Sequence, residues 1–207
     1  MAVRTITNSL YDKLPNLTLG FHGCSRATYE KVIYKREHLK RSANSYDWLG
    51  NGIYFWENSY ERALEWAKNK YHGDACVIGA VLYLGHCLNL TDYKSSLFLH
   101  EAYKATKITY EMQKLDLPVN KNGRSKTDVL MRDLDCTVIE MVHYLSQQKD
   151  NTWAPFDSVR GVFLEGQMVY PGSAIAEKTH VQSSVVNPNC IKGYFSPIEP
   201  VGEFAVP

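Results

Sequence analysis

The stretches Phe21-His22-Gly23-Cys24 and Gly50-Asn51-Gly52-Ile53-Tyr54-Phe55 decide how this chain is interpreted. A glycine next to His22 leaves backbone N–H and C=O groups open to a flat ligand, because glycine has no Cβ. Tyr54 follows a glycine-rich turn, where its ring can stack on a planar group. Either residue alone is more readily a core histidine or an ordinary strand residue. Together, in this order, they predict a binding cleft.

The composition describes one compact domain over residues 1–207 and no general attraction to polyanions. The chain is 44% hydrophobic and 22% charged, with a formal net charge of +1. It can therefore bury a sizeable core, and any nucleic-acid site must be local. The five cysteines are scattered without zinc-ligand spacing, so we expect no metal and reduced thiols. Neither a signal peptide nor an apolar run of about 20 residues is visible, which predicts a cytoplasmic protein that does not enter membranes.

Short apolar runs alternate with helical periodicities along the chain. This pattern predicts an α+β fold with a split, mainly antiparallel sheet. A parallel doubly wound sheet is disfavoured because no GxGxxG follows a first strand. Strands are expected over residues 17–23, 51–56, 75–84, 157–164, 181–186 and 191–195. Helices are expected over 26–38 and 59–70, and residues 97–148 should form a mostly helical insertion with helices at 97–114 and 134–148.

Residues 19–68, from LGFHGCSRATYEKVI to NGIYFWENSYERALEWA, resemble ADP-ribosyltransferases of the diphtheria-toxin and poly(ADP-ribose) polymerase type. That family has a strand ending in His-Gly, a helix, a Gly-x-Gly-Ile-Tyr-Phe strand and a further helix. The resemblance covers roughly residues 19–70 and 160–195. It implies a two-sheet fold and NAD as co-substrate, with nicotinamide released as ADP-ribose is transferred.

The resemblance also implies roles for single residues. His22 would hydrogen-bond the adenosine-side ribose of NAD, Gly23 would offer backbone groups to the nicotinamide amide, and Tyr54 would stack near the nicotinamide. The family's second stacking Tyr is missing from the following helix, where Trp66 is either its substitute or a core residue. The residues expected to contact NAD are His22, Gly23, Cys24, Gly52, Tyr54 and Phe55.

The third catalytic residue of that family is usually a Glu at the start of a late strand, and here Gln182 stands in that place. Gln keeps the hydrogen-bonding geometry but loses the charge. The expected catalytic set is therefore His22, Tyr54 and Gln182, with Glu177 and Glu165 open as alternative carboxylates. A neutral residue argues against chain elongation, because polymerisation must activate a ribose hydroxyl. We expect a mono-ADP-ribosyltransferase with a better nucleophile as acceptor.

A basic stretch with interleaved tyrosines follows the first motif. Such side chains can grip phosphates and stack bases, although a solvated helix face or contact with the NAD pyrophosphate fits as well. The group Tyr46-Asp47-Trp48 is expected on the acceptor side. This favours single-stranded nucleic acid as acceptor, with protein left open. The expected acceptor-binding residues are Lys35, Arg36, Lys40, Arg41, Tyr46 and Trp48.

A compact chain of this type resembles intracellular bacterial toxins of toxin–antitoxin or antiphage systems. That resemblance implies an antitoxin protein as a possible partner. Because the family's usual Glu is missing, the alternative is a non-catalytic domain of the same fold that binds NAD-like or ADP-ribosylated ligands.

Overall fold

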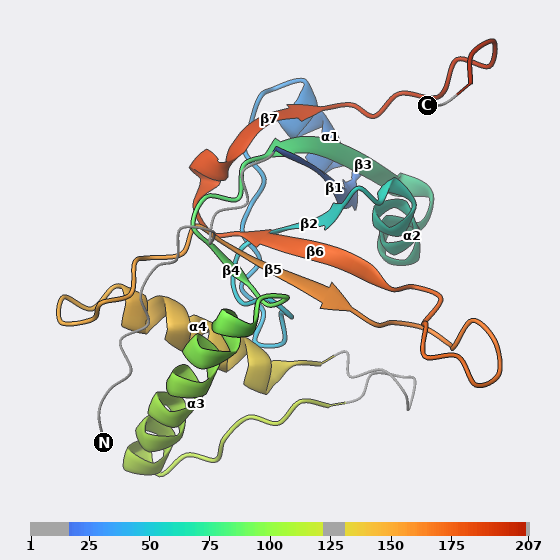
Figure 1. The fold of residues 1–207 in the computed structure, drawn as a ribbon. Coiled ribbons are helices and arrows are strands. Elements are labelled where there is room, and N and C mark those ends of the chain that lie inside the picture. Colours follow the sequence, from blue (N-terminus) through green and yellow to red (C-terminus); the bar gives the residue numbers. More distant parts are fainter. Residues whose placement is uncertain (1–16, 122–130, 206–207) are drawn as a thin grey trace.

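The computed structural model describes residues 17–121 and 131–205, which form one mixed sheet of seven strands with four α-helices around it (Figure 1). The predicted α+β class is confirmed. Strands β1 to β7 are Thr18–Ser25, Ile53–Glu57, Ala75–Leu82, Cys87–Asn89, Ser158–Phe163, His180–Val185 and Ile191–Phe195. Helices α1 to α4 are Arg26–Ile33, Tyr60–Tyr71, Tyr93–Gln113 and Asp133–Ser146.

The strands follow the order β4-β5-β6-β2-β1-β3-β7, and only β4 and β5 run parallel. Hydrogen bonding thus joins the strands into one sheet where two sheets were expected. The junction between β1 and β2 is short, with two registered pairs, Gly20 with Glu57 and Phe21 with Trp56. A Cβ at Gly20 would lie 2.8 Å from the Cβ of Phe55, so glycine allows the close contact that joins the two halves.

Helix α1 begins at a well-formed cap and ends earlier than the sequence predicted. The Ser25 hydroxyl accepts a hydrogen bond from the Thr28 N–H at 3.3 Å, which satisfies one free donor of the first turn. The helix ends at Ile33, whereas the periodicity predicted residue 38. Val32 and Ile33 pack against the sheet core, but the residues that follow are exposed and Arg36 has a φ of 59°. Without apolar contacts, the charged residues do not extend the helix.

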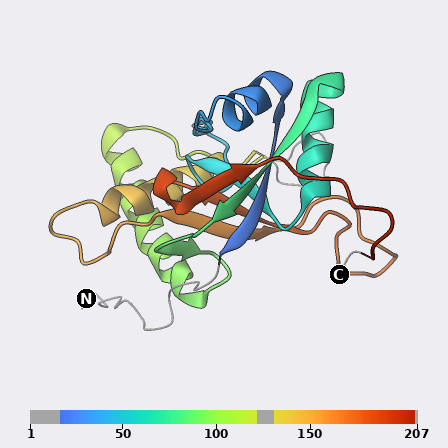
Figure 2. The same cartoon turned by 90° about the horizontal axis from the view of Figure 1, so that it is seen from above.

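Helices α3 and α4 form the predicted helical addition, at the other end of the molecule from α1 and α2 (Figure 2). The addition begins at Tyr93, four positions before the predicted start, because the Asp92 side chain caps the Lys94 N–H at 3.0 Å. The two helices pack on each other and on β4 and β5. Their shared core includes Leu88, Val142, Val159 and Phe163.

Candidate functional site

A pocket of about 600 Å³ lies where β1, β2 and β6 meet α2 and the loop that precedes β2. The three predicted catalytic residues all line it, and each comes from a different strand. His22 lies on β1, Tyr54 on β2 and Gln182 on β6. The sheet order places these strands side by side, although β6 is far from β1 and β2 in the sequence.

His22 is held by the backbone of the neighbouring strand, and this contact defines its tautomer. The distance from His22 Nδ1 to the Tyr54 carbonyl oxygen is 2.8 Å. A carbonyl can only accept, so Nδ1 carries the proton. Burial, together with the charge of Lys70, lowers the His22 pKa below its ordinary value, despite the opposing effect of the bond to Tyr54. The neutral ring therefore offers the Nε2 lone pair to a hydroxyl donor.

Tyr54 uses its hydroxyl to hold the glycine-rich turn. The hydroxyl donates to the Gly50 carbonyl at 2.7 Å and accepts from the Leu49 N–H at 2.8 Å. Burial raises the pKa of Tyr54, so the phenol stays protonated at neutral pH. With the hydroxyl occupied in this way, the ring is the part of Tyr54 that can contact a ligand.

The same turn is held from the other side by Glu140 of α4, a residue that the sequence did not single out. Its carboxylate accepts from the Asn51 backbone N–H at 2.7 Å and from Asn51 Nδ2 at 2.8 Å. Gly50 has a φ of +71°, and a Cβ there would lie 2.6 Å from Glu140 Oε1. Residue 140 lies in the helical region that matched no family pattern, so no sequence signal could have found it.

The glycines of the two motifs are explained by packing as well as by the pocket. A Cβ on Gly23 would lie 2.4 Å from the Ala63 carbonyl oxygen of α2. A Cβ on Gly52 would lie 2.1 Å from Ser184 Oγ on β6. Both glycines line the pocket, but the close approach that requires them is made by the protein itself.

Two residues expected to contact NAD point into the core instead. Cys24 is 2% exposed and Phe55 is fully buried, and neither lines the pocket. Burial raises the pKa of the Cys24 thiol to about 12, so it is not a thiolate at neutral pH. Alternation along β2 places Phe55 on the face opposite Tyr54. Cys24 shares the face of His22 on β1, but it packs into the core cluster that contains Phe55 and Ile78.

Among the three candidates for the third catalytic residue, Gln182 and Glu165 line the pocket, whereas Glu177 is exposed and does not. Gln182 pairs with Trp56 on β2 and Gly161 on β5, and its side chain is buried. Within the described residues, no hydrogen-bond partner satisfies its carboxamide. Glu165 already accepts a hydrogen bond from Arg62 at 2.8 Å.

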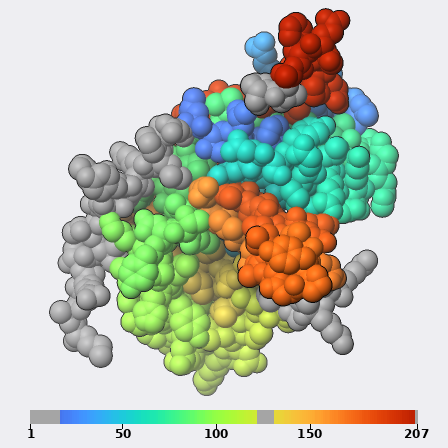
Figure 3. Space-filling view, turned by 45° about the vertical axis from the view of Figure 1, so that its right-hand side comes forward, coloured from blue at the N-terminus to red at the C-terminus, as the bar shows by residue number. Residues whose placement is uncertain are grey.

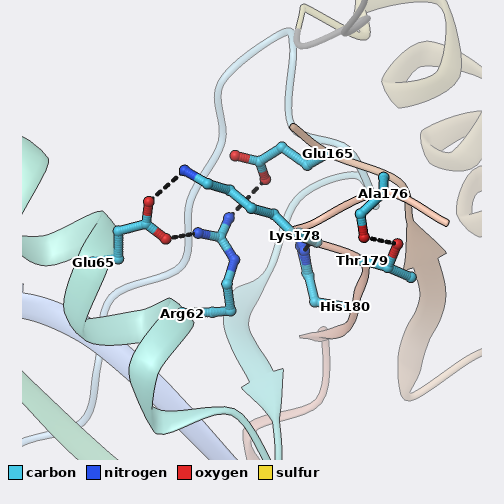
Figure 4. A network of polar contacts seen from close by, with 7 residues as sticks. All are labelled: Arg62, Glu65, Glu165, Ala176, Lys178, Thr179 and His180. Carbon is cyan, nitrogen blue, oxygen red and sulfur yellow. Dashed lines mark hydrogen bonds and ion pairs between the residues drawn. The ribbon is translucent and has the colours of Figure 1, made fainter. Parts of the chain in front are cut away.

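A charge network ties the segment between β5 and β6 to α2 at the edge of the pocket. Figure 4 shows Arg62 and Lys178 both contacting Glu65, with Arg62 also reaching Glu165. In the space-filling view the same segment lies beside α2 (Figure 3). Next to the network, His180 Nδ1 contacts the Lys178 carbonyl at 2.6 Å, and burial lowers the His180 pKa. These contacts hold Glu165 at the pocket.

Basic and aromatic side chains surround the rest of the pocket. Lys70 lies 4.6 Å from the ring centroid of Trp66, and both line the pocket. Trp66 is 36% exposed, so it is not a core residue. The other basic and aromatic lining residues include Lys40, Arg41, Tyr46, Trp48 and Tyr71. Lys35 and Arg36 are exposed but do not line the pocket, so the predicted acceptor-binding set is only partly brought together.

On the opposite face of the sheet, an ion pair links β2 to β5 and β6. Arg160 Nε donates to the two carboxylate oxygens of Glu57 at 2.9 and 3.0 Å, and the Ser183 hydroxyl also donates to Glu57. The Glu57 side chain is only 6% exposed. Because Ser183 neighbours Gln182, this pair stabilises the strand that carries the pocket residue.

Within residues 17–121 and 131–205, no cluster of three or more His, Cys, Asp or Glu side chains is arranged to hold a metal ion. Every helix in these ranges is too short or too polar to cross a lipid bilayer.

Comparison of the chain with protein-family models, curated proteins and solved structures found no match.

Proposed function

We propose that the chain is an NAD-dependent mono-ADP-ribosyltransferase. The observation that carries the proposal is the hydrogen bond between His22 and Tyr54, thirty-two positions apart, beside a pocket that Gln182 also lines. These are the residues on which the resemblance to ADP-ribosyltransferases depends. By the same proposal, the sheet corresponds to the two sheets of that family, one made of β1, β3 and β7 and the other of β2, β6, β5 and β4. The support is that β1 and β2, which join these two halves, share only two registered pairs.

The chemistry of ADP-ribose transfer fits the groups that line the pocket. Nicotinamide leaves from NAD as a neutral molecule once its bond to the ribose stretches, so the protein must mainly position the ring and stabilise positive charge on the sugar. Tyr54 supplies a ring for stacking and His22 Nε2 accepts from a ribose hydroxyl. Gln182 offers a carboxamide to the nicotinamide ribose, and a neutral group there fits transfer of a single ADP-ribose.

We infer single-stranded nucleic acid as the acceptor. The support is local, because Lys40 and Arg41 are exposed basic residues at the pocket, beside the aromatic residues Tyr46 and Trp48. The role of an intracellular bacterial toxin or antiphage effector, with an antitoxin protein as partner, follows from the resemblance alone.

The decisive experiment follows both products of the reaction. The protein is incubated with NAD labelled in the adenylate phosphate, together with purified RNA, single-stranded DNA or protein extract. Nicotinamide release and label transfer are then measured in each fraction. We expect transfer into nucleic acid. Transfer into protein alone would change the acceptor and leave the reaction class intact, whereas NAD binding with neither release nor transfer would indicate a non-catalytic domain.

Variants assign the third catalytic residue in the same assay. Gln182→Ala should abolish most transfer if the Gln182 carboxamide contacts NAD. Glu165→Gln should retain transfer if Glu165 serves mainly to pair with Arg62. Glu101→Ala, which removes an exposed surface ion pair with Lys104, is the matched control and should behave as wild type. The reverse order for the first two variants would make Glu165 the working carboxylate.

A further inference from the structure

One face of α4 holds the loop that forms a wall of the pocket. Residues 133, 136 and 140 are spaced by three and four positions and therefore share a helix face. They contact residues 44–51 through Ser45 Oγ to Asp133 Oδ1 (2.7 Å), Cys136 Sγ to Asn44 O (3.5 Å) and the two bonds from Asn51 to Glu140. The segment 42–52, which contains this loop, contributes Ser42, Asn44, Tyr46, Asp47, Trp48 and Gly52 to the pocket lining.

Glu140 makes the strongest of these contacts. Both of its oxygens accept hydrogen bonds from Asn51, one from the backbone and one from the side chain. Hydrogen bonds to a carboxylate are shorter and stronger than those between neutral groups. Glu140 is also partly buried, so water competes less for these donors than it would at an exposed site.

The contacts continue from Glu140 to the ring of Tyr54. Glu140 fixes Asn51, which lies between Gly50 and Gly52 in the turn. The carbonyl of Gly50 accepts from the Tyr54 hydroxyl, and the Leu49 N–H donates to the same hydroxyl. A displacement of the turn therefore also removes the anchor of the Tyr54 side chain, at the point where its ring faces the pocket.

We propose that Glu140 is a positioning residue, which acts through the turn at residues 49–52 to fix the Tyr54 ring at the pocket. It touches no reacting atom. The consequence for NAD rests on the proposed function, but the effect on the turn does not. The helical addition would thus form part of the catalytic machinery instead of serving only as extra core.

Two substitutions separate a positioning role from general support of the fold. Glu140→Ala removes both acceptors. In Glu140→Gln, one oxygen still accepts from the Asn51 N–H, and the new NH₂ group can donate to the Asn51 side-chain oxygen after that amide flips. Glu140→Gln should therefore keep the contacts with Asn51 that Glu140→Ala loses. Glu101→Ala on α3 is again the exposed control.

The first readout is independent of activity. Amide hydrogen exchange is measured at Leu49 and Asn51, whose N–H groups donate to Tyr54 and Glu140. Glu140→Ala should speed exchange at both sites by about tenfold or more, the scale of a lost hydrogen bond to a charged group. Glu140→Gln and the control should stay close to wild type. Unchanged exchange at Leu49 in Glu140→Ala would overturn the proposal.

The second readout is kinetic. If the wild-type protein releases nicotinamide, Glu140→Ala should raise the KM for NAD and lower kcat/KM by about ten- to a hundredfold, since small displacements of positioning groups have effects of this size. Equal losses in Glu140→Ala and Glu140→Gln would contradict a positioning role. If the wild type neither binds NAD nor releases nicotinamide, the proposed function fails, and amide exchange still decides whether Glu140 fixes Tyr54.

Discussion

Replacing His22 by alanine tests the candidate site most directly, because the structure assigns a different task to each ring nitrogen. Nδ1 donates to the Tyr54 carbonyl, and Nε2 is left as an acceptor at the pocket. His22→Ala removes both groups. Loss of the first should lower the stability of the folded protein, and loss of the second should weaken only the proposed complex with NAD, so the two effects can be measured separately.

The expected sizes follow from the hydrogen bonds involved. The bond to Tyr54 should contribute about 0.5–1.5 kcal/mol to stability. For a chain of this length, 1 kcal/mol corresponds to about 2–4 °C in Tm, so the variant should melt about 1–6 °C lower. Leaving a ribose hydroxyl unpaired in the pocket should weaken binding by about 1–3 kcal/mol. That is about a 5- to 150-fold increase in Kd.

Thermal unfolding measures the change in Tm, and calorimetric titration with NAD measures the change in Kd. His100→Ala is the matched control, since His100 is an exposed histidine on α3 that does not line the pocket. It should change neither Tm nor Kd. A His22→Ala variant that folds and binds NAD within twofold of wild type would refute the assignment of Nε2. A lower Tm with unchanged Kd would leave His22 with a structural role only.

Four further outcomes are expected. Tyr54→Phe keeps the stacking ring but loses both hydrogen bonds to the turn, so urea unfolding should show a loss of about 1–3 kcal/mol, whereas Tyr54→Ala should also reduce transfer by about a hundredfold. Arg160→Met removes the cationic partner of the buried Glu57 carboxylate and should destabilise by about 3–5 kcal/mol, most of which Arg160→Met with Glu57→Met should restore. Burial lowers the pKa of His22, His143 and His180 in the folded state. As the pH falls below about 6.5, these histidines take up protons in the unfolded chain before they do so in the folded protein, so the free energy of unfolding should decrease. Urea unfolding that gives a larger free energy of unfolding at about pH 5.5 than at about pH 7.5 would contradict this. Binding of single-stranded nucleic acid should weaken with salt at a slope of about −0.7 per phosphate contacted, and alanine at Lys40 and Arg41 should reduce the slope while NAD affinity stays nearly unchanged.

Six of the seven described strands could be predicted from the sequence as short runs bounded by turn residues, whereas β4, Cys87–Asn89, was not predicted because three residues are too few to show a pattern. The run at residues 75–84 became β3, Ala75–Leu82, close to its predicted bounds. The end of α1 could not be predicted in this way. Charged residues follow Ile33 at spacings that a helix tolerates, but they are exposed, and Arg36 adopts a positive φ that a helix does not allow. Periodicity describes what a helix can bury, but tertiary contacts decide where it ends.

The sequence could predict those pocket residues that lie in the two motifs of β1 and β2 and in strand β6. Alternation along β2 separates Tyr54, which lines the pocket, from Phe55, which is buried on the other face. That alternation was available from the sequence, but which face carried the pocket was not. Glu140 was beyond reach for a different reason, because its contact with Asn51 joins positions 89 apart and depends on how α4 packs.

Gly23 and Gly52 show why a motif can be found more easily than it can be explained. Each lines the pocket, so an open backbone at a ligand was a reasonable interpretation. Yet a Cβ at either position would first collide with the protein, at the Ala63 carbonyl of α2 or the Ser184 hydroxyl of β6. The glycines let α2 and β6 approach closely enough to form the walls of the pocket. A substitution at either glycine would therefore disturb the fold and the site together, and loss of activity there could not by itself identify a ligand contact.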